Sequence, residues 1–296
     1  MAAPIYSQIA GNRRRTFLLI AFFIVLIVAI GWAIGAYIQN PSYAITLAFV
    51  FALFSTGVSY YGGDKVALWT SGARAVSREE ALPLHRIIEN LAITAGIPKP
   101  SVYLIPDAAI NAFATGRDPK HSSIAVTSGA LQKLEDEELE GVLAHELSHV
   151  KNYDIRVMTL VVLLVGTITI LADMFFRTRF LGARNSDRDR GGNPLMIIGL
   201  VLIILSPIIA RLISLAVSRK REYLADASGA LLTRFPDGLA RALEKIQREA
   251  RPLARASTAT AHLYISNPFA RRNFANLFST HPPLEERIKL LKQMTS

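Results

Sequence analysis

The stretch His145-Glu146-Leu147-Ser148-His149 combines two imidazoles and one carboxylate at a spacing suited to metal chemistry. Residues four apart lie on one face of a helix, so the rings of His145 and His149 can reach the same metal ion. Glu146 lies beside the first ring, where it can hold an attacking water and take its proton. The pattern predicts an active site for zinc-dependent peptide hydrolysis.

A catalytic zinc ion usually has three protein ligands and leaves a fourth position to water. The chain contains no Cys, so the third ligand must be a His or a carboxylate. The best candidate is Glu222, which directly follows the basic run Arg219–Arg221. The alternative interpretation is that this charged cluster only anchors a helix at a membrane edge.

Two acidic residues are placed to support the ligating histidines, because such histidines commonly donate their second N–H to a carboxylate. Asp226 lies one helical turn beyond Glu222 on the same face and fits this role. Asp154 follows His149 by five positions. For Asp154 we favour an ordinary polar residue where a helix enters the bilayer.

The hydropathy pattern predicts four membrane spans. Hydrophobic residues make up 51% of the 296-residue chain, and residues 16–63 contain no charged side chain. A span needs about 20 apolar residues, so this run is long enough for two spans separated by a turn at residues 39–42. Residues 157–176 and 191–217 are the third and fourth candidates.

Basic residues predict how these spans are oriented. The cluster Arg13–Arg15 is expected in the cytoplasm, and two crossings then return Lys65 and Arg74 to that side. The histidine pair follows on the same side. Two further crossings bring Glu222 back to it, so that all three proposed ligands can meet.

The net charge of +10 and the absence of Cys narrow the class of protein. We find no recognised nucleic-acid motif, so attraction to anionic lipid headgroups explains the basic balance better than nucleic-acid binding. Without Cys there are no disulfides, no thiolate ligands and no Cys nucleophile.

The soluble parts predict a mixed fold. The capping pattern Ser77–Glu80 predicts a helix to residue 95, and a second helix is expected from Asp136 through His149. No Pro or Gly occurs in residues 150–155, which allows this helix to continue into the third span. Strands are expected at 101–105, 110–114 and 124–127, and Gly116, Asp118 and Pro119 are expected in the turn between the last two. Further helices are expected at 219–232, 237–250 and 284–293. A mobile loop region is expected at 251–281.

Four ordered motifs together resemble the HtpX heat-shock membrane proteases of peptidase family M48. They are Asn111-Ala112-Phe113-Ala114, the segment 143–154 around the histidine pair, Arg221–Asp226, and Ser279-Thr280-His281-Pro282-Pro283. The resemblance covers nearly the whole chain, including two spans before the first motif histidine and two between His149 and Glu222.

The resemblance implies a gluzincin-type catalytic domain on the cytoplasmic side of a prokaryotic plasma (inner) membrane. It implies one zinc ion per chain held by His145, His149 and Glu222, with Glu146 as general base. Asn111, Ala112 and Phe113 would form an edge strand that pairs with an extended substrate. Asp226 and His281 would support the site. Without the resemblance, His281 is better interpreted as a polar residue before the last helix. The implied role is stress-responsive quality control of misfolded or damaged membrane proteins.

Together these inferences predict an α+β, mainly helical protein: a zinc protease domain with a small β-sheet, plus four transmembrane helices. The expected order is a cytoplasmic tail (1–16), two spans (17–62), the first catalytic part (63–154), a transmembrane hairpin (155–217) and the second catalytic part (218–296). The expected partners are polypeptide substrates and the lipid bilayer, with no nucleic acid. The alternative function is a non-catalytic membrane scaffold or chaperone-like subunit with a structural metal.

One loop conflicts with the predicted orientation. Between the third and fourth spans, five arginines would lie outside the cell: Arg177, Arg179, Arg184, Arg188 and Arg190. A reporter enzyme fused at Asn185 tests this, and a crossing hairpin predicts an external readout. A cytoplasmic readout there, matching a control fusion at Ser296, would instead mean that residues 155–217 dip into the bilayer and return.

Overall fold

The computed structural model describes residues 5–37, 39–162, 164–168, 219–257, 259–269 and 282–294. The predicted fourth span, the arginine-rich loop before it and His281 lie outside these residues. Of the predicted third span, residues 157–162 and 164–168 are described, and they are helical.

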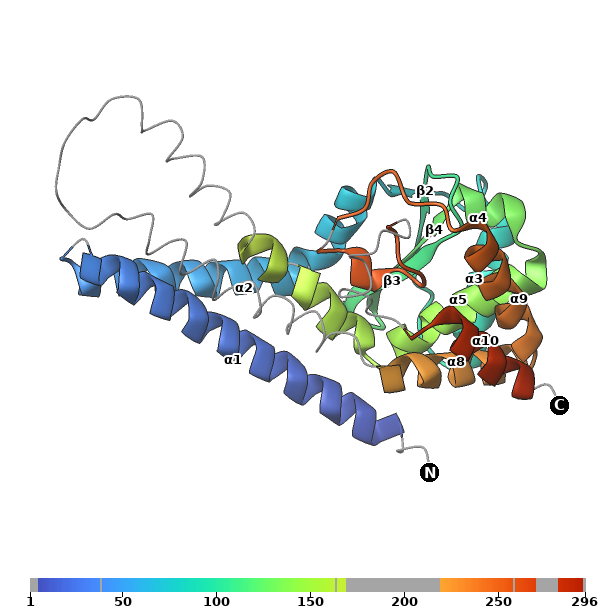
Figure 1. The fold of residues 1–296 in the computed structure, drawn as a ribbon, viewed down its shortest axis with the longest axis horizontal. Helices are drawn as coiled ribbons and strands as arrows, with labels where there is room; N and C mark the ends of the chain where they lie inside the picture. The colour runs from blue at the N-terminus through green and yellow to red at the C-terminus, as the bar shows by residue number, and fades with distance from the viewer. Residues whose placement is uncertain are drawn as a thin grey trace.

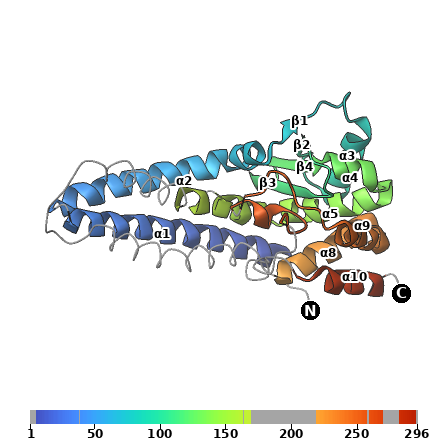
Figure 2. The same cartoon turned by 45° about the horizontal axis from the view of Figure 1, so that its top comes forward.

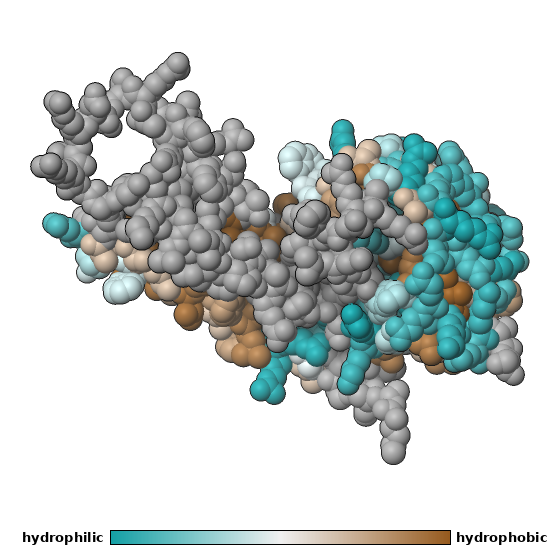
Figure 3. Space-filling model, viewed as in Figure 1, coloured by the Kyte–Doolittle hydropathy of each residue, from teal (hydrophilic) through white to brown (hydrophobic). Residues whose placement is uncertain are grey.

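Two long helices extend side by side from a globular part that carries the sheet (Figures 1 and 2). They are α1 (Ile5–Tyr37) and α2 (Pro41–Ser71), and both are long and apolar enough to cross a membrane. Apolar residues follow this pair, whereas hydrophilic residues cover much of the globular part (Figure 3). Two of the four predicted spans are therefore seen as helices of spanning length.

Small residues and a tight turn hold α1 against α2. A Cβ built on Gly31 would lie 2.3 Å from Ala48 Cβ, so the helices approach closely at this point. The predicted break is present: Gln39 has a φ of 57°, and Asn40 caps α2 by accepting a hydrogen bond from the Tyr43 N–H. This turn therefore joins the end of α1 to the start of α2.

The sheet has four strands in the order β1-β2-β4-β3, which places β3 at an edge. The strands are β1 (Arg74–Ala75), β2 (Ser101–Ile105), β3 (Ala112–Asp118) and β4 (His121–Thr127). Strands β2 and β4 run parallel, while the β1–β2 and β3–β4 pairs are antiparallel. The strand predicted at 101–105 is confirmed residue for residue.

The β3–β4 hairpin is longer than the sequence predicted. Gly116 and Asp118, expected in the turn, lie in β3, where the register shifts between them. Gly116 adopts a φ of 140°, and a Cβ there would lie 2.2 Å from the His121 carbonyl oxygen. This irregularity lets the strand continue past a glycine, and Asp118 closes the turn by accepting from the Lys120 and His121 N–H groups.

Helix α5 (Asp136–Lys151) lies between the sheet and the C-terminal helices (Figures 1 and 2). Its neighbours include α3 (Leu82–Ala95), α8 (Arg219–Thr233), α9 (Pro236–Glu249) and β3. Helix α10 (Leu284–Gln293) packs on α8 and α9, and the short α4 (Ser128–Lys133), which the sequence did not predict, follows β4. Leu143, Leu147 and Val150 are fully buried in the shared core, so α5 is held on every side.

Helix α3 begins four residues later than predicted, at Leu82 instead of Arg78. The expected capping contacts exist, since Ser77 N–H donates to Glu80 and Glu80 N–H donates to the Ser77 hydroxyl. They close a separate turn, and the helix starts at Leu82. Pro83 has no N–H to donate to the preceding turn, so the helical hydrogen-bond ladder begins only after it. The predicted end is confirmed by Gly96, which has a φ of 70°.

Helix α5 does not continue unbroken into the predicted third span. Asn152 and Tyr153 form a turn after Lys151, and the chain is helical again from residue 154. Tyr153 has a φ of 60°, a left-handed conformation that ends an α-helix. The absence of Pro and Gly from residues 150–155 therefore led to a wrong prediction of a continuous helix here.

The described residues of the predicted loop region 251–281 include an ordered, buried part. Thr260 and residues 262–266 are buried, and η1 (Ala261–Leu263) is a 3₁₀ turn. Ile265 N–H donates to the Ala112 carbonyl of β3, and the Tyr264 ring packs against Phe113 with centroids 5.0 Å apart. Long-range contacts with the edge strand order a segment that has no periodic pattern of its own.

The close approach of α5 and α9 predicts a clear stability difference between two glycine substitutions. A Cβ at Gly141 would lie 2.6 Å from the Leu239 backbone nitrogen, so Gly141→Ala should cost about 1–3 kcal/mol. Gly62→Ala in α2 meets nothing within 4 Å and should be neutral or slightly stabilising. Thermal unfolding of the detergent-solubilised chain measures both, and equal melting temperatures would contradict this packing.

Candidate metal centre

Helices α5 and α8 bring His145, His149 and Glu222 together. One ligand atom from each lies within 4.8 Å of the others, and all three side chains are buried. The helices can approach because α8 carries Gly229, where a Cβ would lie 3.0 Å from the His145 backbone nitrogen. The three predicted ligands thus converge from two segments that are far apart in the sequence.

The distances within this group fit a zinc ion. The two imidazole Nε2 atoms are 3.3 Å apart, and Glu222 oxygens lie 3.8 Å from His145 Nε2 and 3.7 Å from His149 Nε2. Two nitrogen ligands of a tetrahedral zinc at 2.0–2.1 Å lie about 3.3 Å apart, so the histidine pair already has the required separation.

The charge around the group also favours a divalent cation. Four buried carboxylates surround the histidines, and the buried cations beside them are Arg221 and Arg287. Counted formally over the described residues, these four acidic and two basic side chains give a net charge of −2, which suits a divalent cation. The four acidic residues are Glu146, Asp154, Glu222 and Asp226.

The pKa values of the two histidines differ because their partners differ. Burial lowers the pKa of His145 to about 4, so this ring is neutral, as a metal ligand must be. Burial also opposes charge on His149, but the Asp154 hydrogen bond and the Glu222 charge raise its pKa to about 9. Burial raises the pKa of Glu146 to about 8. Burial and the charge of Glu222 favour the protonated carboxyl of Glu146, and the neighbouring carboxylates favour the cationic form of His149.

Asp226 orients His145, in the position expected from the sequence. An Asp226 oxygen lies 2.9 Å from His145 Nδ1, which leaves Nε2 facing the other candidate ligands. Arg287 donates two hydrogen bonds to the same carboxylate, at 2.9 and 2.7 Å. Burial alone would raise the pKa of Asp226, but the charge and hydrogen bonds of Arg287 lower it to about 2.

Asp154 contacts His149, so its interpretation as a polar residue at the bilayer edge is wrong. It is only 2% exposed, and its Oδ2 lies 3.1 Å from His149 Nδ1. The turn at Asn152 and Tyr153 folds the chain back so that Asp154 faces the ring. Arg221 lies 3.3 Å from the other carboxylate oxygen. No sequence signal marked this break, because residues 150–155 contain neither Pro nor Gly.

Glu146 is fixed between the metal group and the sheet. Its Oε2 accepts a hydrogen bond of 2.9 Å from the Ala114 N–H of β3. Ala112 of the same edge accepts from Ile265, and the Asn111 side chain donates to the Ser266 carbonyl. The segment predicted to receive a substrate thus leads into an edge strand beside Glu146. At Ala112 this edge is already hydrogen-bonded to Ile265 of the same chain.

Sequence reasoning missed Arg287, which lies six positions after the predicted His281. Its guanidinium is fully buried, and besides Asp226 it donates to the Ile265 carbonyl at 3.2 Å. The signal was present in the helical pattern: Arg287 shares a face of α10 with the buried Leu291. An arginine on the apolar face of an amphipathic helix indicates a buried anionic partner.

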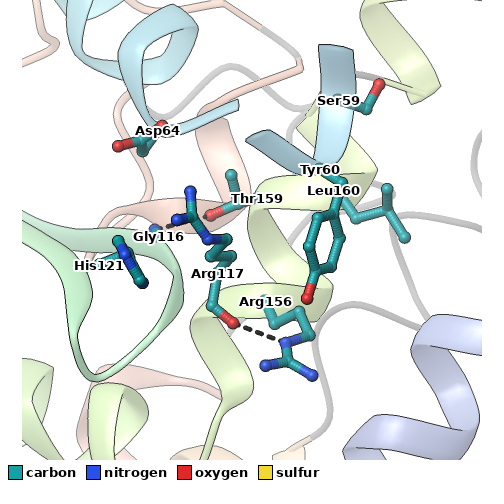
Figure 4. Close-up of a pocket in the computed structure, with 9 residues that line it drawn as sticks. All are labelled: Ser59, Tyr60, Asp64, Gly116, Arg117, His121, Arg156, Thr159 and Leu160. Atoms are coloured by element: carbon teal, nitrogen blue, oxygen red, sulfur yellow. Dashed lines mark hydrogen bonds between the residues drawn. The ribbon is translucent and has the colours of Figure 1, made fainter. Parts of the chain in front are cut away.

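A separate pocket lies between helix α2 and the β3–β4 hairpin (Figure 4). It is lined from α2, the β3–β4 hairpin and the helical segment after α5, and it contains none of the candidate ligands. Arg156 donates to the Arg117 carbonyl at 2.6 Å, and Gly116 N–H donates to the Thr159 hydroxyl at 3.1 Å. These contacts fix the hairpin to the segment that leads toward the membrane.

Comparisons with known proteins agree with this geometry. The model of peptidase family M48 matches residues 78–295. A "Protease HtpX homolog" of Thermoanaerobacter pseudethanolicus is 47% identical over 98% of both chains, and one from Tropheryma whipplei is 49% identical over 98% of both. A Pyrococcus furiosus relative of the same description is 49% identical over 95% of both chains.

A solved structure shares the fold. The crystal structure of S. mikatae Ste24p matches with a TM-score of 0.50 and 20% sequence identity, over 96% of this chain. The match spans 66% of the Ste24p chain, so that protein is considerably longer.

The buried Arg287–Asp226 pair predicts a large stability effect. Arg287→Met leaves the Asp226 charge buried without its main partner, which should cost about 3–5 kcal/mol. Arg248 forms an exposed i,i+4 pair with Glu244 at 3.6 Å, and Arg248→Met should cost no more than about 0.5 kcal/mol. Denaturant unfolding of both variants compares them, and a similar small loss for Arg287→Met would contradict the proposed burial of the pair.

Proposed function

Since the chain belongs to peptidase family M48 and is a membrane metalloprotease, we propose that it is a zinc endopeptidase with His145, His149 and Glu222 as metal ligands and Glu146 as general base. The observation that carries this proposal is the 3.3 Å separation of the two Nε2 atoms with the Glu222 carboxylate facing both.

The donor set favours a catalytic metal over a structural one. Among the described residues, the candidate group holds three ligand side chains, whereas structural zinc sites are closed by four. The alternative scaffold function needs a fourth protein ligand, and His281, outside the described residues, is the notable candidate. Glu146 next to the group supports catalysis, because a closed structural site has no use for a base.

When bound, a zinc ion would supply a Lewis acid for the scissile carbonyl and would lower the pKa of its bound water to about 7. Glu146 accepts the proton of the attacking water and later donates it to the leaving amine. The Ala114 N–H holds one oxygen of this carboxylate, so the side chain is oriented before substrate binds. That anchoring reduces the conformational freedom that must be lost in the transition state.

The carboxylates behind the histidines set which nitrogen faces the metal group. Asp226 and Asp154 each pair with an Nδ1 atom, so the Nε2 lone pairs point into the site. Arg287 keeps Asp226 charged and fixed on its outer side. We assign Asp226 and Asp154 as orienting residues, and His281 keeps its proposed role as a transition-state donor.

The edge strand β3 supports an extended polypeptide as substrate. Asn111 leads into β3, and Ala112 and Phe113 are its first two residues. A substrate strand added to this edge would pass the base, Glu146. In that register it would take the place of Ile265 on the Ala112 carbonyl. Backbone pairing of this kind tolerates varied side chains, as an enzyme acting on misfolded proteins requires.

The position of the site supports membrane proteins as substrates. The helical segment that follows Asp154 packs against α1 through a shared apolar cluster that includes Phe23, Val161 and Leu164. The candidate ligands therefore lie next to the membrane helices. We propose misfolded or damaged membrane proteins as the natural substrates.

The contacts of α1 support a cytoplasmic active site. Asn12, near the start of α1, donates to the Asn152 carbonyl, so the N-terminal end of this span and the catalytic part share one side of the membrane. Arg13–Arg15 lie at that end, and such clusters favour the cytoplasm. The proposed setting is a four-span protein of a prokaryotic plasma membrane with the domain boundaries predicted above.

Replacing the base separates catalysis from metal binding. Glu146→Gln should retain zinc, because the three ligands are intact, and should lower kcat by roughly 10²–10⁴-fold. Glu140→Gln on the same helix serves as the matched control and should leave turnover unchanged. Zinc content is measured by metal analysis, and turnover by cleavage of an unfolded membrane protein with and without chelator.

The outcomes distinguish the two proposed functions. Unchanged turnover in Glu146→Gln would contradict the role of this residue as base. A zinc-loaded wild-type chain that binds the unfolded protein but never cleaves it would favour the scaffold function instead.

A further inference from the structure

A buried asparagine connects the first membrane helix to the catalytic part. Asn12 is 1% exposed, although the next three residues, Arg13–Arg15, are exposed. Its Nδ2 donates to Asp154 Oδ1 at 2.8 Å and to the Asn152 carbonyl at 2.9 Å. A buried amide is costly unless its hydrogen bonds are satisfied, so these contacts determine where α1 can dock.

Both acceptors belong to the break between α5 and the segment that enters the membrane. Asn152 precedes Tyr153, whose φ of 60° is unfavourable for a residue with a side chain. Asp154 follows directly and turns toward His149. One side chain of α1 therefore binds both ends of the turn that brings Asp154 to the ring.

The two oxygens of Asp154 have separate partners. Oδ2 lies 3.1 Å from His149 Nδ1, while Oδ1 accepts from Asn12 at 2.8 Å and lies 3.3 Å from Arg221. Holding Oδ1 fixes the rotation of the carboxylate, and the carboxylate then fixes the plane of the imidazole. The contact with Asn12 is the shorter of the two that hold Oδ1.

We propose that Asn12 is a positioning residue for His149, acting through Asp154, so that docking of the first membrane helix completes the metal site. The inference rests on the proposed function, in which His149 is a zinc ligand. It adds a requirement from outside the catalytic part: a chain whose first helix is misplaced has the ligand residues but holds the His149 ring loosely.

Asn12→Leu tests the proposal in the full-length chain, because leucine keeps the branched shape of the side chain and supports the helix while removing the amide group that donates both hydrogen bonds. Zinc affinity, measured by competition with a chelator, should fall by roughly tenfold, the lower end of the effect of removing a residue that orients a metal ligand. We expect kcat to fall and KM to stay nearly constant. In the Co²⁺-substituted protein the d–d absorption bands should change as the ring loses its fixed orientation.

Thr16→Val is the matched control. Thr16 is buried one turn further along α1, and its hydroxyl bonds the Asn12 backbone carbonyl without touching Asp154. This variant should keep the wild-type zinc affinity and Co²⁺ spectrum. An equal loss in Thr16→Val would overturn the proposal, since the effect would then be general packing of the helix.

A double-mutant cycle with Asp154→Ala supplies the second test. If Asn12 acts through Asp154, adding Asn12→Leu to Asp154→Ala causes no further loss of zinc affinity. Additive losses, or wild-type zinc affinity in Asn12→Leu alone, would overturn the proposal. Failure of the proposed function has a different signature: His149→Ala and Glu222→Gln would then both keep the wild-type zinc affinity.

Discussion

Each candidate histidine ligand has a buried carboxylate behind it, and this pairing constrains the rest of the molecule. Asp226 serves His145 and Asp154 serves His149. A buried carboxylate is stable only when its charge and hydrogen bonds are satisfied. Arg287 satisfies Asp226, while Asn12 and Arg221 satisfy Asp154, so α8, α10 and the first membrane helix must all reach α5.

Helix α5 can serve as this meeting point because it is almost entirely buried. Its apolar residues join the main core, and its glycine at position 141 and that of α8 at position 229 let neighbouring helices approach its backbone. On the opposite side, Glu146 is tied to the edge strand through Ala114. The two histidines and Glu146 therefore lie on one helix, which also contacts the edge strand and the helix that carries Glu222. A displacement of α5 would disturb all of these groups together.

The break after α5 decides how the catalytic part meets the membrane. A continuous helix would carry Asp154 away from His149, because a residue five positions further on lies on a different face. The left-handed Tyr153 stops the helix and returns the carboxylate to the ring. The same turn sends the chain into the apolar cluster with α1, so the geometry of the site and the direction of the membrane segment have one origin.

The sequence by itself determined the features that depend on local spacing. Two histidines four apart, an acid beside the first, Asp226 one turn after Glu222, and long uncharged runs need only helical periodicity and hydropathy to be interpreted. β2, α8, α9 and α10 were predicted within a residue or two for the same reason. The family motifs further directed attention to Glu222 and to the edge strand.

Only the tertiary structure decided which distant groups share the site. Arg287 and Asn12 lie near opposite ends of the chain, and neither has a local pattern that names its partner. Asp154 was interpreted as an ordinary polar residue because the turn at Tyr153 has no sequence signal. Residues 260–266 lack periodicity, and contacts with β3 order them. Such contacts depend on how helices far apart in sequence pack together, which local propensity does not encode.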